Sequence, residues 1–174
     1  PFIKEGTKLI DICLLIENKI RKYSSENGIN NGIAFPVGLS LNNIAAHWTP
    51  QKNDTTVLTK NDVLKVDYGV HVDGSIIDSA FTWCVNEEYN SLVDSSKEAV
   101  DKITKMAGVD TKLNEIGELC EEIVYSYETE KDGIFTPVKI IDNLYGHSIL
   151  PWKIHGGKMI KNKKNTDETR IEDN

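Results

Sequence analysis

Two aspartates, Asp67 and Asp78, stand in a stretch rich in Val, Ile, Tyr and Phe, residues 65–82, and their carboxylates could hold metal ions. Asp73-Gly74 interrupts the stretch. Asp-Gly between two β-rich runs predicts a hairpin with a two-residue turn and positive φ at both turn positions. Carboxylates that are diagonal neighbours on such a hairpin have Cβ atoms roughly 7–8 Å apart, and two-metal hydrolases place their ions about 3.5–4 Å apart. The spacing therefore suits metal-assisted hydrolysis.

The register of the hairpin decides whether the two carboxylates meet. Pairing outward from the turn places Asp78 opposite Gly69 and Asp67 opposite Ala80, and side chains alternate along each strand. One face then carries both aspartates and His71, and the other is an apolar packing surface made of Val66, Tyr68, Val70, Val72, Ile77 and Phe81. Without a cation, one of two neighbouring carboxylates would tend to stay protonated. The alternative, two solvated aspartates on an exposed sheet face, stays open, and a one-residue slip in register would undo the pairing of the carboxylates.

Four histidines are the other candidates for metal binding or proton transfer: His47, His71, His147 and His155. Histidine is the commonest metal ligand and the usual proton carrier near neutral pH, although a lone histidine is more often packed or solvated. His147 follows a glycine and His155 precedes two, and such small neighbours would let an imidazole approach a crowded site. We expect His71 to be solvated at the end of the sheet. The sequence has no GxSxG elbow and no complete phosphate-binding loop.

Composition and charge limit the classes of protein to consider. The 174 residues suffice for one domain or part of one, and 39% hydrophobic with 27% charged residues is ordinary for a globular protein. The net charge of −7 argues against nucleic acid or an anionic membrane as a direct partner, and no apolar run approaches the length of a membrane span. Three separated cysteines, Cys13, Cys84 and Cys120, favour buried thiols in a reducing compartment, so we expect a cytoplasmic protein.

Hydrophobic periodicity and turn residues predict the elements that must position these side chains. Helices are expected at residues 7–23, 92–106 and 113–124, and strands at 33–35, 65–82 and 134–141. Pro36 should stop the first strand, Pro137 marks an edge or irregularity in the last, and Asp110 or Thr111 could cap the last helix. The polar tail, residues 161–174, looks poorly packed. The order favours an α+β fold with an antiparallel sheet and flanking helices.

Several motifs together resemble the type 2 methionine aminopeptidase family, and they run in order over nearly the whole chain. They are Ala34-Phe35-Pro36, Ser40-Leu41-Asn42-Asn43, Ala45-Ala46-His47-Trp48-Thr49-Pro50, Asp54-Thr55-Thr56-Val57-Leu58, residues 65–81, Gly146-His147-Ser148-Ile149 and Ile154-His155-Gly156-Gly157-Lys158. The resemblance implies the pita-bread fold, in which two pseudosymmetric halves surround a dinuclear metal site. It also implies removal of the N-terminal methionine from peptides and nascent proteins.

The resemblance further implies a role for individual residues. By motif, Asp67, Asp78 and His147 match metal ligands, His47 matches the catalytic histidine that contacts substrate, and Phe35, Ile154 and His155 match the lining of the methionine pocket. Two divalent ions are the implied cofactors, with Mn, Co, Fe and Zn all suited to carboxylate and imidazole ligands. The implied partners are peptide and nascent-protein N-termini, with the ribosome as a further expectation and a monomer as the expected state.

The sequence also departs from that family. The family's two glutamate ligands follow the Ile154–Lys158 motif at a distance that this chain does not reach, and Tyr145 stands where we expect Asn. Residues 1–174 are therefore expected to be part of a catalytic domain without its C-terminal portion, inactive alone and weak in metal binding. Two alternatives are a non-catalytic interaction protein of the same fold and a peptidase of the prolidase or aminopeptidase P kind. The Ala45–Pro50 motif argues against the second.

Overall fold

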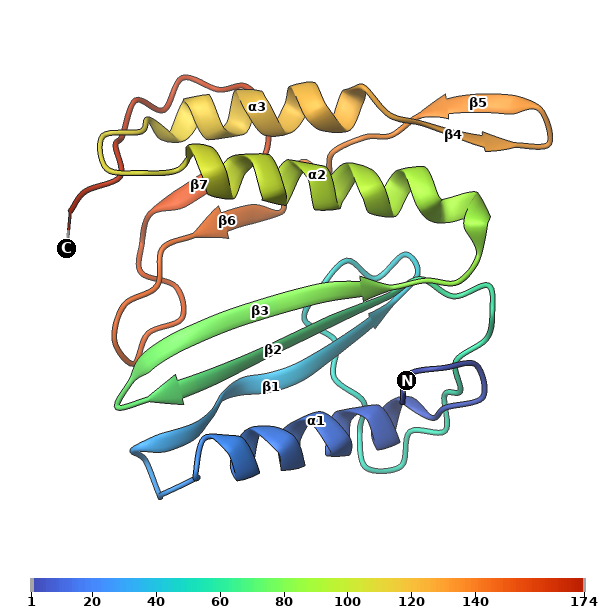
Figure 1. Cartoon of the computed structure of the whole chain (residues 1–174), viewed down its shortest axis with the longest axis vertical. Helices are drawn as coiled ribbons and strands as arrows, with labels where there is room; N and C mark the ends of the chain where they lie inside the picture. The colour runs from blue at the N-terminus through green and yellow to red at the C-terminus, as the bar shows by residue number, and fades with distance from the viewer. Residues whose placement is uncertain (1, 174) are drawn as a thin grey trace. The chain divides into compact units, whose positions relative to one another are not determined.

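The computed structural model describes residues 2–173 and divides them into two compact units. The first unit comprises residues 2–86 and 149–156, and the second comprises 87–148 and 157–173. Figure 1 shows helices and antiparallel strand pairs in both. The predicted α+β class with an antiparallel sheet and flanking helices is confirmed.

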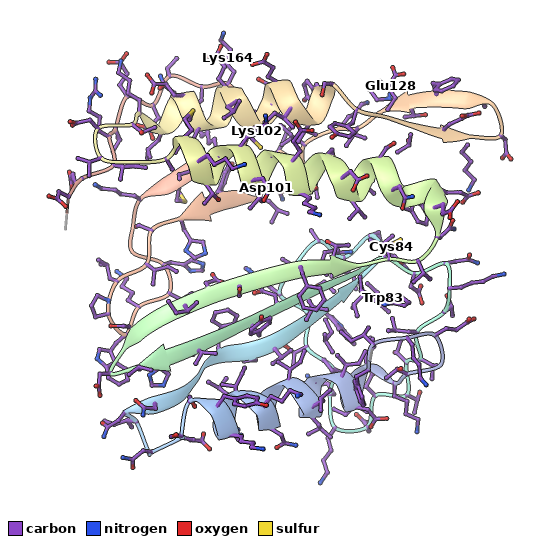
Figure 2. All side chains as sticks on the ribbon, viewed as in Figure 1. Trp83, Cys84, Asp101, Lys102, Glu128 and Lys164 are labelled. Carbon is purple, nitrogen blue, oxygen red and sulfur yellow. The ribbon has the colours of Figure 1, made fainter. Side chains whose placement is uncertain are left out.

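The first unit is an antiparallel sheet with a helix on one face. Helix α1 (Leu9–Tyr23) lies along the sheet, whose strands β1 (Asn31–Leu41), β2 (Leu64–Val72) and β3 (Ser75–Trp83) are arranged in that order (Figure 1). The core between helix and sheet consists of Leu9, Ile12, Cys13, Val37, Leu39, Leu58, Leu64 and Val66. Trp83, labelled in Figure 2 at the end of β3, packs against this core. The first predicted helix is confirmed.

The β2–β3 hairpin has the predicted register. Gly69 pairs with Asp78, and Asp67 pairs with Ala80. The turn dipeptide Asp73-Gly74 has φ angles of 48° and 82°, and positive φ at both positions matches the type I′ turn that the Asp-Gly signal predicts. The aspartates are therefore diagonal neighbours on one face, and the alternative of a slipped register is excluded.

Only part of the hairpin's apolar face is buried, although we expected a packing surface along its whole length. Val66 on β2 is 0% exposed, whereas its cross-strand partner Phe81 is 47% exposed and Ile77 is 68% exposed. The difference arises because β3 is at the edge of the sheet, while α1 packs against β1. The side chains alternate as predicted, but α1 does not cover the third strand.

Strand β1 continues through Pro36, which we expected to end it. Its pairing with β2 shifts register on both sides of Phe35. Since β1 is an edge strand with bulges, a proline that lacks an N–H group is tolerated there. The shifts align Phe35 with Gly69 and Gly38 with Asp67, so they bring two β1 residues to the carboxylate face of the hairpin.

Among the described residues, the second unit contains a short 3₁₀ turn, two long helices and two small antiparallel strand pairs (Figure 1). In chain order they are η1 (Glu87–Tyr89), α2 (Asn90–Met106), α3 (Leu113–Tyr125), β4 (Glu128–Lys131), β5 (Ile134–Pro137), β6 (Tyr145–His147) and β7 (Met159–Lys161). Strand β4 pairs with β5, and β6 with β7. Both predicted helices are confirmed, whereas the strand expected at 134–141 ends at Pro137.

The polar tail is packed against α3, not loosely attached as we expected. The N–H groups of Leu113 and Asn114, in the first turn of α3, donate to the carbonyl oxygens of Thr169 and Asp167 at 2.8 and 3.0 Å. These bonds satisfy donors that a helix start leaves without intrahelical partners. The N-cap residue of α3 is Lys112. The prediction that Asp110 or Thr111 caps this helix was wrong.

A glycine on α3 makes this packing possible. A Cβ built on Gly117 would lie 2.5 Å from the carbonyl oxygens of both Lys161 and Lys163. Lys164, labelled in Figure 2, then reaches Glu118 with 2.6 Å between Nζ and Oε1. Composition suggested a loosely packed tail because the contact is made by backbone atoms, and the side chains of this segment are mostly charged or polar.

The three cysteines are free thiols, as predicted. Cys13 and Cys120 are buried, and Cys84 is half-buried. Burial, with the neighbouring carboxylate of Glu17, raises the pKa of the Cys13 thiol to about 11. Along residues 2–173, no helix combines the length and the apolar character that crossing a bilayer requires.

Candidate functional site

The paired aspartates of the first unit form the centre of the candidate site. Asp67 is half-buried and Asp78 is exposed, and their diagonal placement puts the Cβ atoms roughly 7–8 Å apart or somewhat less. Small residues flank Asp67 on both sides, because Gly38 pairs with it from β1 and Ala80 from β3. A Cβ on Gly38 would lie 3.2 Å from the Cβ of Asp67. A residue larger than glycine at position 38 would therefore crowd the side chain of Asp67.

Phe35 lies beside this pair, and its role in a substrate pocket stays a prediction. A Cβ built on Gly69 would lie 2.2 Å from Cε1 and 2.8 Å from Cζ of Phe35. The phenyl ring therefore occupies the space over Gly69, on the same face as both aspartates. The space that glycine leaves at position 69 is thus filled by an apolar ring.

His47 has a strained backbone next to the same strand. Its φ is 64°, a left-handed conformation that is uncommon outside glycine and clusters at functional sites. The following residue, Trp48, is fixed to β1: its carbonyl oxygen accepts a hydrogen bond from Leu39 N at 2.7 Å, and that oxygen lies 3.8 Å from a Cβ built on Gly38. Since Gly38 pairs with Asp67, the backbone at His47 is near the aspartate pair, and its side chain is exposed.

Ile154 and His155, the other two predicted pocket residues, lie in the segment 149–156, which belongs to the first unit. Ile154 is half-buried and His155 is exposed. The segment turns back on itself through reciprocal backbone hydrogen bonds between Leu150 and Lys153, at 3.0 and 2.9 Å. All the predicted pocket residues are therefore in the unit that carries the aspartates.

His147 is on β6 in the second unit, where it pairs with Met159. It is half-buried, and its Nδ1 is 3.4 Å from the carbonyl oxygen of Ser148. Among residues 2–173, no three His, Cys, Asp or Glu side chains are grouped so that they could hold a metal ion. The assignment of His147 as a third ligand beside the aspartates stays a prediction.

His71 differs from our expectation of a solvated side chain. It is half-buried, its ring centroid is 5.2 Å from that of Trp152 at a tilt of 55°, and its Nδ1 is buried without a hydrogen-bond partner among the described residues. Trp152 was not among the predicted site residues. It lies between the motifs Gly146–Ile149 and Ile154–Lys158, two residues before Ile154.

The fold is similar to that of two solved structures that are named as peptidases. The chain superposes on a methionine aminopeptidase from Rickettsia prowazekii with a TM-score of 0.76 and 17% identity, covering 98% of this chain and 66% of that one. It superposes on a prolidase from Pyrococcus furiosus with a TM-score of 0.68 and 17% identity, covering 98% and 46%. With this fold and a match to a metallopeptidase family over residues 1–174, the class is that of the pita-bread metallopeptidases.

The chain belongs to metallopeptidase family M24, whose profile matches residues 1–174. Curated relatives called methionine aminopeptidase 2 include those of Laccaria bicolor, 49% identical over 171 residues, and Komagataella phaffii, 48% identical over 171 residues. Each alignment covers 98% of this chain, but only 48% and 38% of the respective relative. The resemblance to the type 2 enzymes is confirmed, and the chain spans less than half the length of these relatives.

Proposed function

We propose that the protein of which this chain is a part removes the N-terminal methionine from peptides and nascent proteins with the help of divalent metal ions. One observation carries the proposal: Asp67 and Asp78 converge on one face of the hairpin with the ring of Phe35 beside them. The identity of 48% to a methionine aminopeptidase 2 supports the choice of substrate. The coverage of 38% of that relative supports our view of residues 1–174 as part of a catalytic domain.

The donor set suits a divalent cation. Asp67 and Asp78 would hold the metal, with His147 as a third ligand, and the cross-strand neighbours of Asp67 are the small residues Gly38 and Ala80. Carboxylate and imidazole donors suit Mn, Co, Fe and Zn, and we propose two ions. Such ions supply Lewis acidity towards a carbonyl group and make a bound water more acidic.

The chain's own residues bind and orient the substrate. Phe35 and Ile154 offer apolar surface for the methionine side chain, and His155 lies next to Ile154 in the same turn. The side chain of His47 is exposed, next to the part of β1 that pairs with Asp67. It would contact the substrate or share a proton with the substrate. Peptide and nascent-chain N-termini are the proposed partners. We also propose that the protein is a monomer, that it associates transiently with the ribosome and that it is located in the cytoplasm.

The test uses the full-length protein and a panel of peptides with a divalent metal present. We expect release of Met from Met-Ala peptides, and His47→Ala should lose most of this activity while keeping its bound metal. Lys52→Ala, an exposed change a few residues further on, serves as the matched control and should leave both unchanged. Comparable activity on N-terminal Leu or Lys, cleavage only before proline, or activity that survives complete chelation would contradict the proposal. A protein that neither binds metal nor cleaves would favour the interaction module.

A further inference from the structure

The segment 149–156 is fixed to the tip of the β2–β3 hairpin by Trp152. The N–H group of Trp152 donates to the carbonyl oxygen of Gly74 at 2.9 Å. The indole lies directly against the same glycine, because a Cβ built on Gly74 would be 2.2 Å from Nε1 and 2.4 Å from Cε2. Trp152 therefore makes both a backbone and a side-chain contact with the turn.

His71 supplies a second contact for the indole. Its ring is tilted by 55° to that of Trp152, with 5.2 Å between centroids, which is a favourable geometry for aromatic rings. Since His71 Nδ1 is buried without a hydrogen-bond partner among the described residues, packing against Trp152 is a main part of its environment. The turn that presents Trp152 is itself tight, with φ of 61° at Trp152.

We propose that Trp152 is a positioning residue that holds the segment 149–156, and with it Ile154 and His155, against the hairpin that carries Asp67 and Asp78. The inference rests on the proposed function for what these residues bind, but the attachment itself is a property of the first unit. Ile154 follows Trp152 by two residues, so a loss of the indole contact releases the pocket lining from the strand pair that holds the carboxylates.

The contact with Trp152 is a second reason why position 74 requires glycine. Its φ of 82° already disfavours other residues, and the indole then occupies the place of a side chain. The chain contains a matched turn, Asp132-Gly133, in the β4–β5 hairpin. There Gly133 has φ of 76°, and nothing lies within 4 Å of a Cβ built on it. Alanine at Gly133 would therefore have the same unfavourable backbone conformation as alanine at Gly74, but it would not clash with another side chain.

Amide hydrogen exchange on the full chain tests the attachment. Gly74→Ala should increase exchange at Trp152 and Lys153 about tenfold through local opening, whereas Gly133→Ala should leave exchange in segment 149–156 unchanged. Trp152→Ala should increase exchange at Lys153 and Ile154 as well, and Trp152→Phe should restore most of the protection. If Gly74→Ala does not fold, the two Trp152 variants decide alone. Equal exchange in segment 149–156 for the wild type and Trp152→Ala would overturn the proposal.

Kinetics on the full-length protein test the consequence for substrate. Trp152→Ala should raise KM for a Met-Ala peptide about tenfold with a much smaller change in kcat, because uniform binding of substrate is lost. Its metal content should stay that of the wild type, and Trp152→Phe should return KM towards the wild-type value. A merely structural role would lower the amount of active enzyme and hence kcat, and that result would overturn the positioning role. If the wild type released no methionine, the proposed function would fail, while hydrogen exchange would still decide the attachment.

Discussion

The ring of Phe35 on β1 lies over Gly69 on β2, so closely that a Cβ on the glycine would be 2.2 Å from Phe35 Cε1. The contact exists because the bulges of β1 align these two residues. Gly69 has an ordinary φ, so the requirement for glycine comes from the ring and not from the turn preferences of the backbone. One missing methyl group thus places the apolar part of the candidate site next to its carboxylates.

Gly69→Ala should destabilise the first unit by about 1–3 kcal/mol, since overpacking forces the ring or the strand to move. Urea unfolding measures the change. Gly108→Ala, where nothing lies within 4 Å of the new Cβ, is the control and should have little effect. The double variant Gly69→Ala/Phe35→Ala should cost less than the sum of its single changes, because the clash is removed. Strict additivity would show that Phe35 and Gly69 are not in contact.

Local signals explain what the sequence predicted well. The turn at Asp73-Gly74 fixes the register of the hairpin, and the register alone determines that Asp67 and Asp78 share a face. The same dipeptide at Asp132-Gly133 marks the β4–β5 hairpin, with φ angles of 53° and 76°. Strand β4 was not predicted, although this dipeptide carries the same signal as Asp73-Gly74.

Features that depend on tertiary contacts could not be predicted in this way. Pro36 should end a strand by local sterics, and it is tolerated only because β1 is a bulged edge strand. The tail from Lys161 is polar, and it is held by backbone hydrogen bonds to the start of α3 and by the ion pair between Lys164 and Glu118. The attachment of Trp152 to Gly74 joins residues that are far apart in the sequence, so no local pattern indicates it.

Acid should lower the stability of the turn at residues 59–62, which precedes β2, because it protonates Asp62. Burial favours the neutral form, but hydrogen bonds from Asn42 Nδ2 at 2.8 Å and Thr59 N at 2.7 Å lower the pKa of the Asp62 carboxyl. A carboxyl pKa that is lower in the folded state gives stability that is fully present above the unfolded pKa of about 3.9 and is lost as pH falls from there through the lower pKa of the folded state. Asp62→Ala should cost about 1 kcal/mol at neutral pH.

Urea unfolding of the chain at about pH 7 and about pH 3 measures this loss. Asn42→Ala should show a weaker dependence on pH than the wild type, because it removes one of the bonds to the charged carboxylate. The variant Asp62→Asn should be the least sensitive to acid. If the wild type and Asp62→Asn lost stability equally between these pH values, other carboxylates would have to cause the acid sensitivity.

The exposed apolar side of β3 should make residues 1–174 associate with themselves. Ile77 and Phe81 are 68% and 47% exposed on an edge strand, and exposed apolar edges promote strand pairing between chains. Ile77→Thr keeps a β-branched residue suited to strands and should reduce association, with a change in unfolding free energy of less than about 0.5 kcal/mol. Sedimentation velocity over a range of concentrations measures association. Val66→Thr, on the same face but 0% exposed, is the matched control and should lower stability by about 1–3 kcal/mol, because it buries a hydroxyl group in the core. The prediction would be wrong if the wild-type chain stayed monomeric at every concentration. It would also be wrong if the Ile77→Thr variant associated as strongly as the wild type.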